Sequence, residues 1–125
     1  MKRAFTLIEI LVVIAIIALL TMAGVTSYKV ANQKARDGRR QGDLEQIRAA
    51  LEMYRTVLDE YPDDKNLLEP DYINSLPADP SGYDYYYFSD GLTYTLCAYL
   101  ELGSGDCGGN ACGATTCNYQ VNNPL

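Results

Sequence analysis

The chain has 125 residues and a formal net charge of −6 at neutral pH. This length is enough for one modest domain besides an N-terminal segment, so a large multidomain enzyme is excluded. The charge is uneven, because residues 61–125 hold nine acidic residues and a single basic one, Lys65. Binding to a phosphate backbone needs clustered Lys and Arg, so nucleic acid is not expected as a direct ligand of this acidic half.

The beginning of the chain predicts a membrane-spanning helix. After a short basic start, residues 10–28 carry no charge and consist mainly of Ile, Leu, Val and Ala. At about 1.5 Å per residue, a helix of this length crosses the roughly 30 Å hydrocarbon core of a bilayer. By hydropathy alone, a plain anchor or a secretory signal peptide is the favoured explanation of the segment.

Glu9 argues for more than an anchor. It lies one turn inside the apolar run, where an unpaired carboxylate costs a few kcal/mol, and residues 5–28 contain no Lys or Arg. A cut between Ala4 and Phe5 would create an α-amino group four residues before Glu9. In a bundle of staggered identical helices, this amine could neutralise Glu9 of a neighbouring copy. The segment is therefore predicted to polymerise.

The run from Ala4 to Ile17, with Phe5 and Glu9 in these places, resembles the class III signal of type IV pilins and type II secretion pseudopilins. The resemblance implies that a prepilin peptidase cuts before Phe5 and methylates its amine, and that Glu9 aligns subunits during assembly. It also implies a precursor in the bacterial inner membrane, which a pilus assembly machinery moves into an extracellular pilus or a periplasmic pseudopilus. This chain has Ala4 where the family usually has Gly, and it lacks the proline that many major pilins carry in the helix.

The helix is predicted to continue through residues 29–61, which contain no proline. Apolar residues recur there at gaps of three and four, which indicates one buried stripe: Leu44, Ile47, Leu51, Tyr54, Leu58 and Tyr61. Basic residues cluster between Lys34 and Arg40. We interpret this cluster as a solvated helix face; a nucleic-acid patch and charge pairing with the acidic half of a neighbouring copy are the alternatives.

Residues 62–125 predict a small head. Closely spaced prolines exclude a long helix after residue 62. Residues 83–88 and 92–100 are typical of strands, and Asp90-Gly91 between them is a strong hairpin signal. Tyr94, Leu96, Ala98 and Leu100 share one face and are expected to pack on the helix. The expected fold is α+β, the pilin fold, with a long N-terminal helix packed on a small antiparallel sheet.

Four cysteines fall near the C-terminus: Cys97, Cys107, Cys112 and Cys117. In an oxidising compartment they are expected to form two disulfides, and of the three possible pairings we favour Cys97–Cys117 with Cys107–Cys112. A zinc site of four thiolates is the competing hypothesis, but no C-x2-C pair is present. The sequence lacks the Asp-x-Asp-x-Asp-Gly loop that a calcium site would use, so the acidic residues are interpreted as a solvated surface.

The sequence contains no His, no nucleophile elbow and no phosphate-binding loop, so no catalytic residue, cofactor or metal is expected. The predicted organisation is a leader (1–4), a transmembrane and polymerisation helix (5–28), an amphipathic helix (29–61) and a head with a disulfide-rich loop (62–125). The first functional hypothesis is a subunit of a type IV pilus that serves adhesion, motility or DNA uptake. The alternatives are the major pseudopilin of a type II secretion system and a membrane-anchored binding domain that never polymerises.

Overall fold

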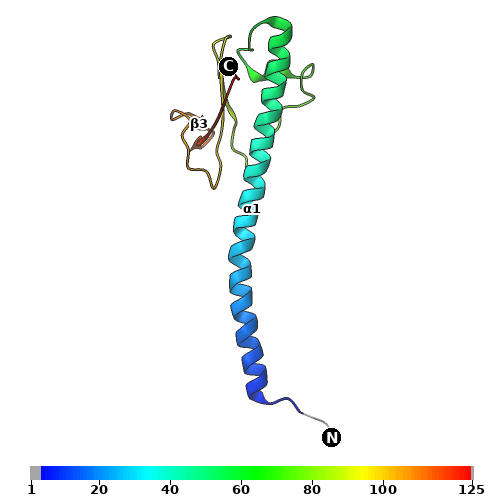
Figure 1. Cartoon of the computed structure of the whole chain (residues 1–125), viewed down its shortest axis with the longest axis vertical. Helices are drawn as coiled ribbons and strands as arrows, with labels where there is room; N and C mark the ends of the chain where they lie inside the picture. The colour runs from blue at the N-terminus through cyan, green and yellow to red at the C-terminus, as the bar shows by residue number, and fades with distance from the viewer. Residues whose placement is uncertain (1–3, 125) are drawn as a thin grey trace. The chain divides into compact units, whose positions relative to one another are not determined.

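A computed structural model of the chain describes residues 4–124; the basic residues expected at the start of the leader, 1–3, lie outside them. The elements in chain order are α1 (Leu7–Leu58), a short 3-10 helix η1 (Lys65–Leu68), β1 (Tyr86–Ser89), β2 (Tyr94–Ala98), β3 (Ala111–Cys112), β4 (Thr115–Thr116) and β5 (Tyr119–Asn122) (Figure 1). The chain forms two compact units, Met1–Gln33 and Lys34–Leu125, and α1 passes through both. This α+β architecture confirms the predicted fold class.

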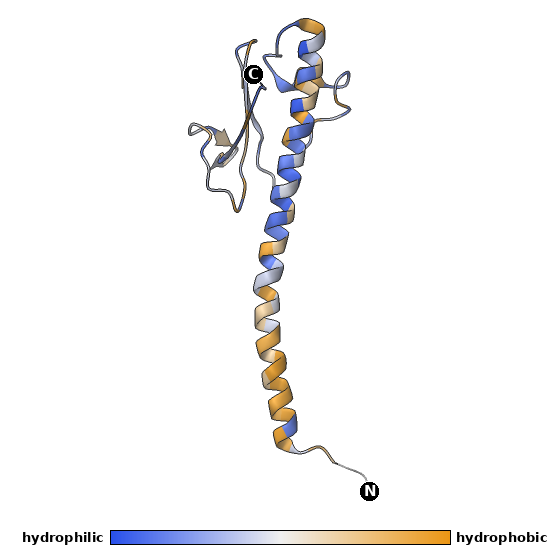
Figure 2. Ribbon diagram, in the orientation of Figure 1, coloured by the Kyte–Doolittle hydropathy of each residue, from blue (hydrophilic) through white to orange (hydrophobic). Residues whose placement is uncertain are grey.

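The first unit is helical from Leu7 onward, and residues 4–31 are exposed. Figure 2 shows the hydrophobic colour concentrated in this part of α1. The helix is long and apolar enough to cross a membrane. Three of its hydroxyls are satisfied internally: Thr21 donates to the carbonyl of Ile17, and Thr26 and Ser27 both donate to that of Ala23, at 2.8–3.2 Å. A bilayer offers no water to these groups, so internal hydrogen bonds favour insertion.

The second unit buries one face of α1. Leu44, Ile47 and Leu51 are at most 1% exposed, which confirms the predicted stripe at these positions. The helix ends at Leu58 and not at residue 61, because Asp59 adopts a positive φ of 61° that α-helical backbone cannot continue. Leu58 consequently stays about half exposed, and Tyr61 reaches the core from outside the helix.

A three-stranded antiparallel sheet, in the order β1-β2-β5, lies along the second half of α1 (Figure 1). The hairpin between β1 and β2 is confirmed: Gly91 has a φ of 83°, and Asp90 Oδ1 accepts hydrogen bonds from the backbone N–H groups of Leu92 and Thr93. The strands are shorter than predicted, but the alternation holds, because Leu96 and Ala98 are fully buried against the helix.

The third strand, β5, was not predicted; the sequence indicated only a loop after residue 101. Here Val121 pairs with Leu96 of β2 and enters the core. Asn118 secures the approach to β5, because its side-chain oxygen accepts from Leu100 N at 2.7 Å and its amide donates to Leu100 O at 2.9 Å. The tail is therefore held by the sheet as well as by disulfides.

The favoured disulfide pairing is wrong. The structure joins Cys97 to Cys107 and Cys112 to Cys117, with Cα–Cα distances of 6.4 and 5.2 Å. The reason is the small β3–β4 hairpin, which folds back at Gly113 and places Cys112 and Cys117 side by side. The sulfurs form one buried cluster beneath the sheet. Within residues 4–124 no group of side chains suitable for a metal was found.

Removing either disulfide is expected to lower the free energy of unfolding of the second unit. In the loop-entropy model, the 10-residue separation of Cys97 and Cys107 corresponds to about 3 kcal/mol, and the 5-residue separation of Cys112 and Cys117 to about 2 kcal/mol. Chemical denaturation of the paired Cys→Ala variants, as full chains in detergent micelles, measures both. A smaller loss for Cys97→Ala/Cys107→Ala than for the other pair would contradict this order.

Candidate assembly site

The start of α1 is closed by Thr6 and Glu9, which satisfy each other's polar groups. Glu9 Oε2 accepts from Thr6 N at 2.8 Å and from Thr6 Oγ1 at 2.9 Å, and Glu9 N donates to Thr6 Oγ1 at 3.3 Å. This is a capping box, in which an N-cap hydroxyl and the carboxylate three residues later bond reciprocally to backbone N–H groups. The sequence analysis missed Thr6, although Thr-x-x-Glu before an apolar run is the signal for it.

The predicted cleavage site lies just before the helix. Residues 4–6 adopt no regular structure and are exposed, and helical backbone begins at Leu7. A protease needs extended, accessible chain at the bond that it cuts, so the Ala4–Phe5 bond has a suitable local structure. Cleavage there stays a prediction. It would leave Phe5 as the new N-terminus, directly before the capping residue Thr6.

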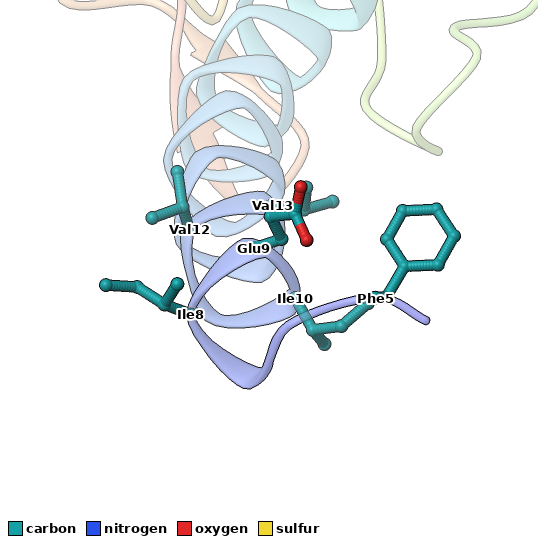
Figure 3. A pocket seen from close by; sticks show the side chains of 6 residues that line it. All are labelled: Phe5, Ile8, Glu9, Ile10, Val12 and Val13. Carbon is teal, nitrogen blue, oxygen red and sulfur yellow. The ribbon is translucent and has the colours of Figure 1, made fainter. Parts of the chain in front are cut away.

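Phe5 and Glu9 border the same hollow. It has a volume of about 390 Å³ and is lined otherwise by apolar side chains, those of Ile8, Ile10, Val12 and Val13. Figure 3 shows the Glu9 carboxylate and the Phe5 ring on the same side of the helix. The hollow is open and apolar apart from one carboxylate. Such a surface is suited to an apolar partner that carries a single cation.

One carboxylate oxygen of Glu9 remains available. Both hydrogen bonds that the carboxylate accepts go to Oε2, and no described residue donates to Oε1. Capping therefore orients the side chain without using all of its acceptor capacity. Oε1 can accept from a cation of another molecule while Oε2 keeps the cap.

A second polar site, which the sequence analysis missed, fixes the head on the helix. Arg40 is fully buried, and its guanidinium donates to Asp79 Oδ2 at 2.5 Å, to Asp37 Oδ1 at 2.8 Å and to Glu101 Oε1 at 3.1 Å. Arg36 forms a bidentate pair with the same Glu101, at 2.6 and 2.7 Å. We call these five residues the arginine network. It joins α1 to the loop at residue 79 and to the turn after β2 that contains Glu101.

The arginine network corrects the interpretation of the basic cluster. Arg40 was expected on a solvated helix face but is 0% exposed, and Arg36 is paired within the chain. Two of the acidic partners, Asp79 and Glu101, lie 39 to 65 residues away in sequence, so no local spacing predicts these contacts. Lys34 and Arg39 do remain exposed, and they make no ion pair with any residue between 4 and 124.

The network also shifts the titration of its acids. Hydrogen bonds from Arg36 and Arg40 lower the pKa of Glu101 from 4.5 to about 2, against the opposing effect of burial. Burial by itself would raise the pKa of Asp79, but the hydrogen bonds from Arg40 and from the backbone of Ser81 outweigh it and the pKa is lowered. Both carboxylates are therefore ionised throughout the neutral range, and each keeps its cation.

Stability of the second unit is expected to fall in acid. The pKa of Glu101 is lower in the folded state than in the unfolded state, so at a pH between these two pKa values the unfolded state binds more protons. Its contribution is complete above pH 4.5 and is lost progressively as the pH falls towards about 2. Urea unfolding of the full chain in non-ionic detergent between pH 6 and 3 measures the slope. The Glu101→Gln variant should show a shallower slope, and an unchanged slope would exclude Glu101 as the titrating group.

Comparisons with known proteins support the resemblance that the N-terminal segment shows. Residues 1–25 match the family model described as the prokaryotic N-terminal methylation motif. The chain is 29% identical over 136 residues to type II secretion system core protein G of Vibrio cholerae serotype O1. This alignment covers 96% of this chain and 93% of that protein. It is 30% identical to the same protein of Pseudomonas aeruginosa, over 87% and 89% of the two chains. For Klebsiella pneumoniae the identity is 33%, over 72% and 76%.

No solved structure matches the chain at a significant level. The similarity to the curated relatives covers the head as well as the methylation motif, so it does not rest on the apolar helix alone. These relatives are core proteins of a secretion machine and not enzymes, and this chain is not an enzyme. The motif and the apolar helix fit an inner-membrane precursor that later enters a pilus or a periplasmic pseudopilus. A chain that shares both its N-terminal motif and its head with these relatives belongs to the type IV pilin and pseudopilin family, in the branch of type II secretion system core protein G.

Proposed function

We propose that this chain is the major pseudopilin of a type II secretion system. It is made as an inner-membrane precursor, cut before Phe5 and methylated there, and it assembles with copies of itself into a short periplasmic filament that acts as a piston for secretion. The observation that carries this proposal is the similarity to core protein G of Vibrio cholerae along 96% of this chain. A type IV pilus, our first hypothesis, has support only from the shared N-terminal motif.

The geometry of the assembly site supports a polymerising subunit. The apolar side chains of the first unit are exposed all around the helix, so the helix needs lipid before assembly and other helices afterwards. Glu9 Oε1 is without a donor among the described residues, and cleavage would supply one cation for each copy at Phe5. The cation of one copy and the carboxylate of the next can then pair while the apolar faces pack.

The head supports the same assignment. Its arginine network and its sheet hold α1 at residues 36–51, so the second unit is fixed on one segment of the helix. Among the pockets of residues 4–124 are open hollows at the N-terminus of α1 and beside Gln46. A unit fixed on the helix suits a filament subunit, which repeats one outer surface along the assembly.

The test is deletion of the gene in the bacterium that encodes the chain. A pseudopilin predicts that proteins normally secreted into the medium accumulate in the periplasm, while twitching motility and long surface filaments are unchanged. A plasmid copy of the full chain should restore secretion. Normal secretion with a loss of surface filaments would replace this proposal by the pilus hypothesis. Normal secretion and normal filaments would favour the membrane-anchored binding domain.

A further inference from the structure

The second unit carries opposite charge at its two ends. At one end, four exposed acidic residues follow the last turn of α1; we call Asp59, Glu60, Asp63 and Asp64 the acidic end. At the other, α1 presents the exposed cations Lys34 and Arg39, which we call the basic end. None of these six side chains takes part in an ion pair with a residue of the described range 4–124.

The cations nearest to the acidic end are engaged elsewhere. Arg55 Nη1 binds Tyr61 Oη at 3.0 Å, and Lys65 Nζ binds the carbonyl oxygen of Tyr85 at 2.5 Å. Two positive charges therefore face four negative ones, and the acidic end keeps a net negative charge. At the basic end, Arg36 and Arg40 face the three carboxylates of the arginine network, so with the exposed Lys34 and Arg39 four cations stand against three anions and a net positive charge remains for a partner.

Each end also exposes an apolar side chain. Tyr61 N donates to Gly91 O at 2.8 Å, which brings the β1–β2 turn to the end of α1, where Leu92 is 74% exposed. Leu102 is 48% exposed at the opposite end, where its N–H donates to Asp37 Oδ2 at 2.9 Å, one helical turn from Lys34. Exposed apolar side chains rimmed by charge are typical of protein–protein contact surfaces.

The two ends cannot meet within one copy. Lys34 and Leu58 are 24 positions apart on a continuous helix, which corresponds to about 36 Å at 1.5 Å per residue. A second copy displaced along the helix by about this distance would bring its basic end to the acidic end of the first. Such a head-to-tail contact uses two different patches, so it leaves a free patch at each end and builds an open filament and not a closed dimer.

We propose that the acidic end of one copy binds the basic end of another copy, farther along the filament than the neighbour whose Phe5 amine meets Glu9, and that this contact joins heads along the filament. The inference rests on the proposed filament function, and its partner is a second copy of this chain. The contact sets the direction and spacing of the subunits, because like ends repel. Its charges are exposed, so it adds to the apolar helix packing and is weakened by salt.

Charge reversal tests the contact in the full chain, expressed with its own peptidase and assembly machinery. Lys34→Glu/Arg39→Glu and Glu60→Lys/Asp63→Lys should each reduce cross-linkable multimers by about tenfold, because like charges then face each other. The chain that carries all four substitutions should regain them. Asp59 and Asp64 are left unchanged, because Asp59 has a positive φ and Asp64 caps η1. The control Asp71→Lys/Asp84→Lys adds the same charge at other exposed sites and should assemble normally.

A photo-reactive residue in place of Lys34 identifies the contact directly. Peptide mass spectrometry should find it joined to a segment that contains residues 59–64 of another copy. Failure of the four-substitution chain to recover would overturn the proposal, and is expected if the basic end binds lipid headgroups instead. Equal losses in the Asp71→Lys/Asp84→Lys control would also overturn it. If the chain without substitutions forms no multimers at all, the proposed filament function is wrong. That outcome differs from a failure of this contact alone, in which the unsubstituted chain still assembles.

Discussion

Replacing Arg40 by alanine is expected to lower the free energy of unfolding of the second unit by about 3–5 kcal/mol, the cost of breaking a buried ion network. Arg40 is fully buried and holds Asp79, Asp37 and Glu101 at 2.5–3.1 Å. Its removal leaves the buried carboxylate of Asp79 without a cation, and the loop at residue 79 loses its attachment to α1. This loss approaches the whole stability of a small unit.

The measurement is urea unfolding of the full chain in non-ionic detergent, followed by tyrosine fluorescence, since the chain has no Trp. Arg39→Ala is the matched control: it removes the same side chain one position earlier, where it is exposed and unpaired within the described residues, and should change stability by less than about 0.5 kcal/mol. Similar losses for the two variants would show that the network contributes little. Arg40→Lys should recover only part of the loss, because an ammonium cannot reproduce the planar fork.

The features that the sequence predicted correctly have short-range signals. The helical stripe at Leu44, Ile47 and Leu51 follows from spacings of three and four, and the β1–β2 hairpin follows from Asp90-Gly91 between two strand-like runs. Glu9 stands out because a charge inside an apolar run is costly. In each case a few neighbouring residues carry the physical constraint, so one sequence is enough to find it.

The features that it missed depend on partners far along the chain. Arg40 looks like any other member of a basic cluster until Asp79 and Glu101 are placed beside it. The four-residue β5 has no clear strand signal and is ordered by pairing with β2. The disulfide pairing was mispredicted because three pairings are compatible with the spacing, and the β3–β4 hairpin that selects one of them has only two residues in each strand.

Glu9→Ala is expected to abolish assembly while the precursor still enters the membrane. The variant removes the only charge in residues 5–28, so the helix inserts at least as well as before. In the filament, however, the cleaved amine of Phe5 would be left among apolar helices without a carboxylate. An unpaired buried charge costs about 3–5 kcal/mol, which corresponds to at least a hundredfold loss in the association equilibrium.

The capping box makes a sharper variant possible. Glu9→Gln keeps a side-chain oxygen that can accept from Thr6 N, but it removes the charge. If Glu9 acted only by starting the helix, Gln would restore assembly; if it neutralises the amine of a neighbouring copy, Gln should fail as Ala does. Multimers and secreted protein are measured together, with Glu45→Gln, an exposed glutamate later in α1, as the control. Full secretion with Glu9→Ala would exclude both filament hypotheses, because an anchor for a monomeric domain has no use for a charge at this depth.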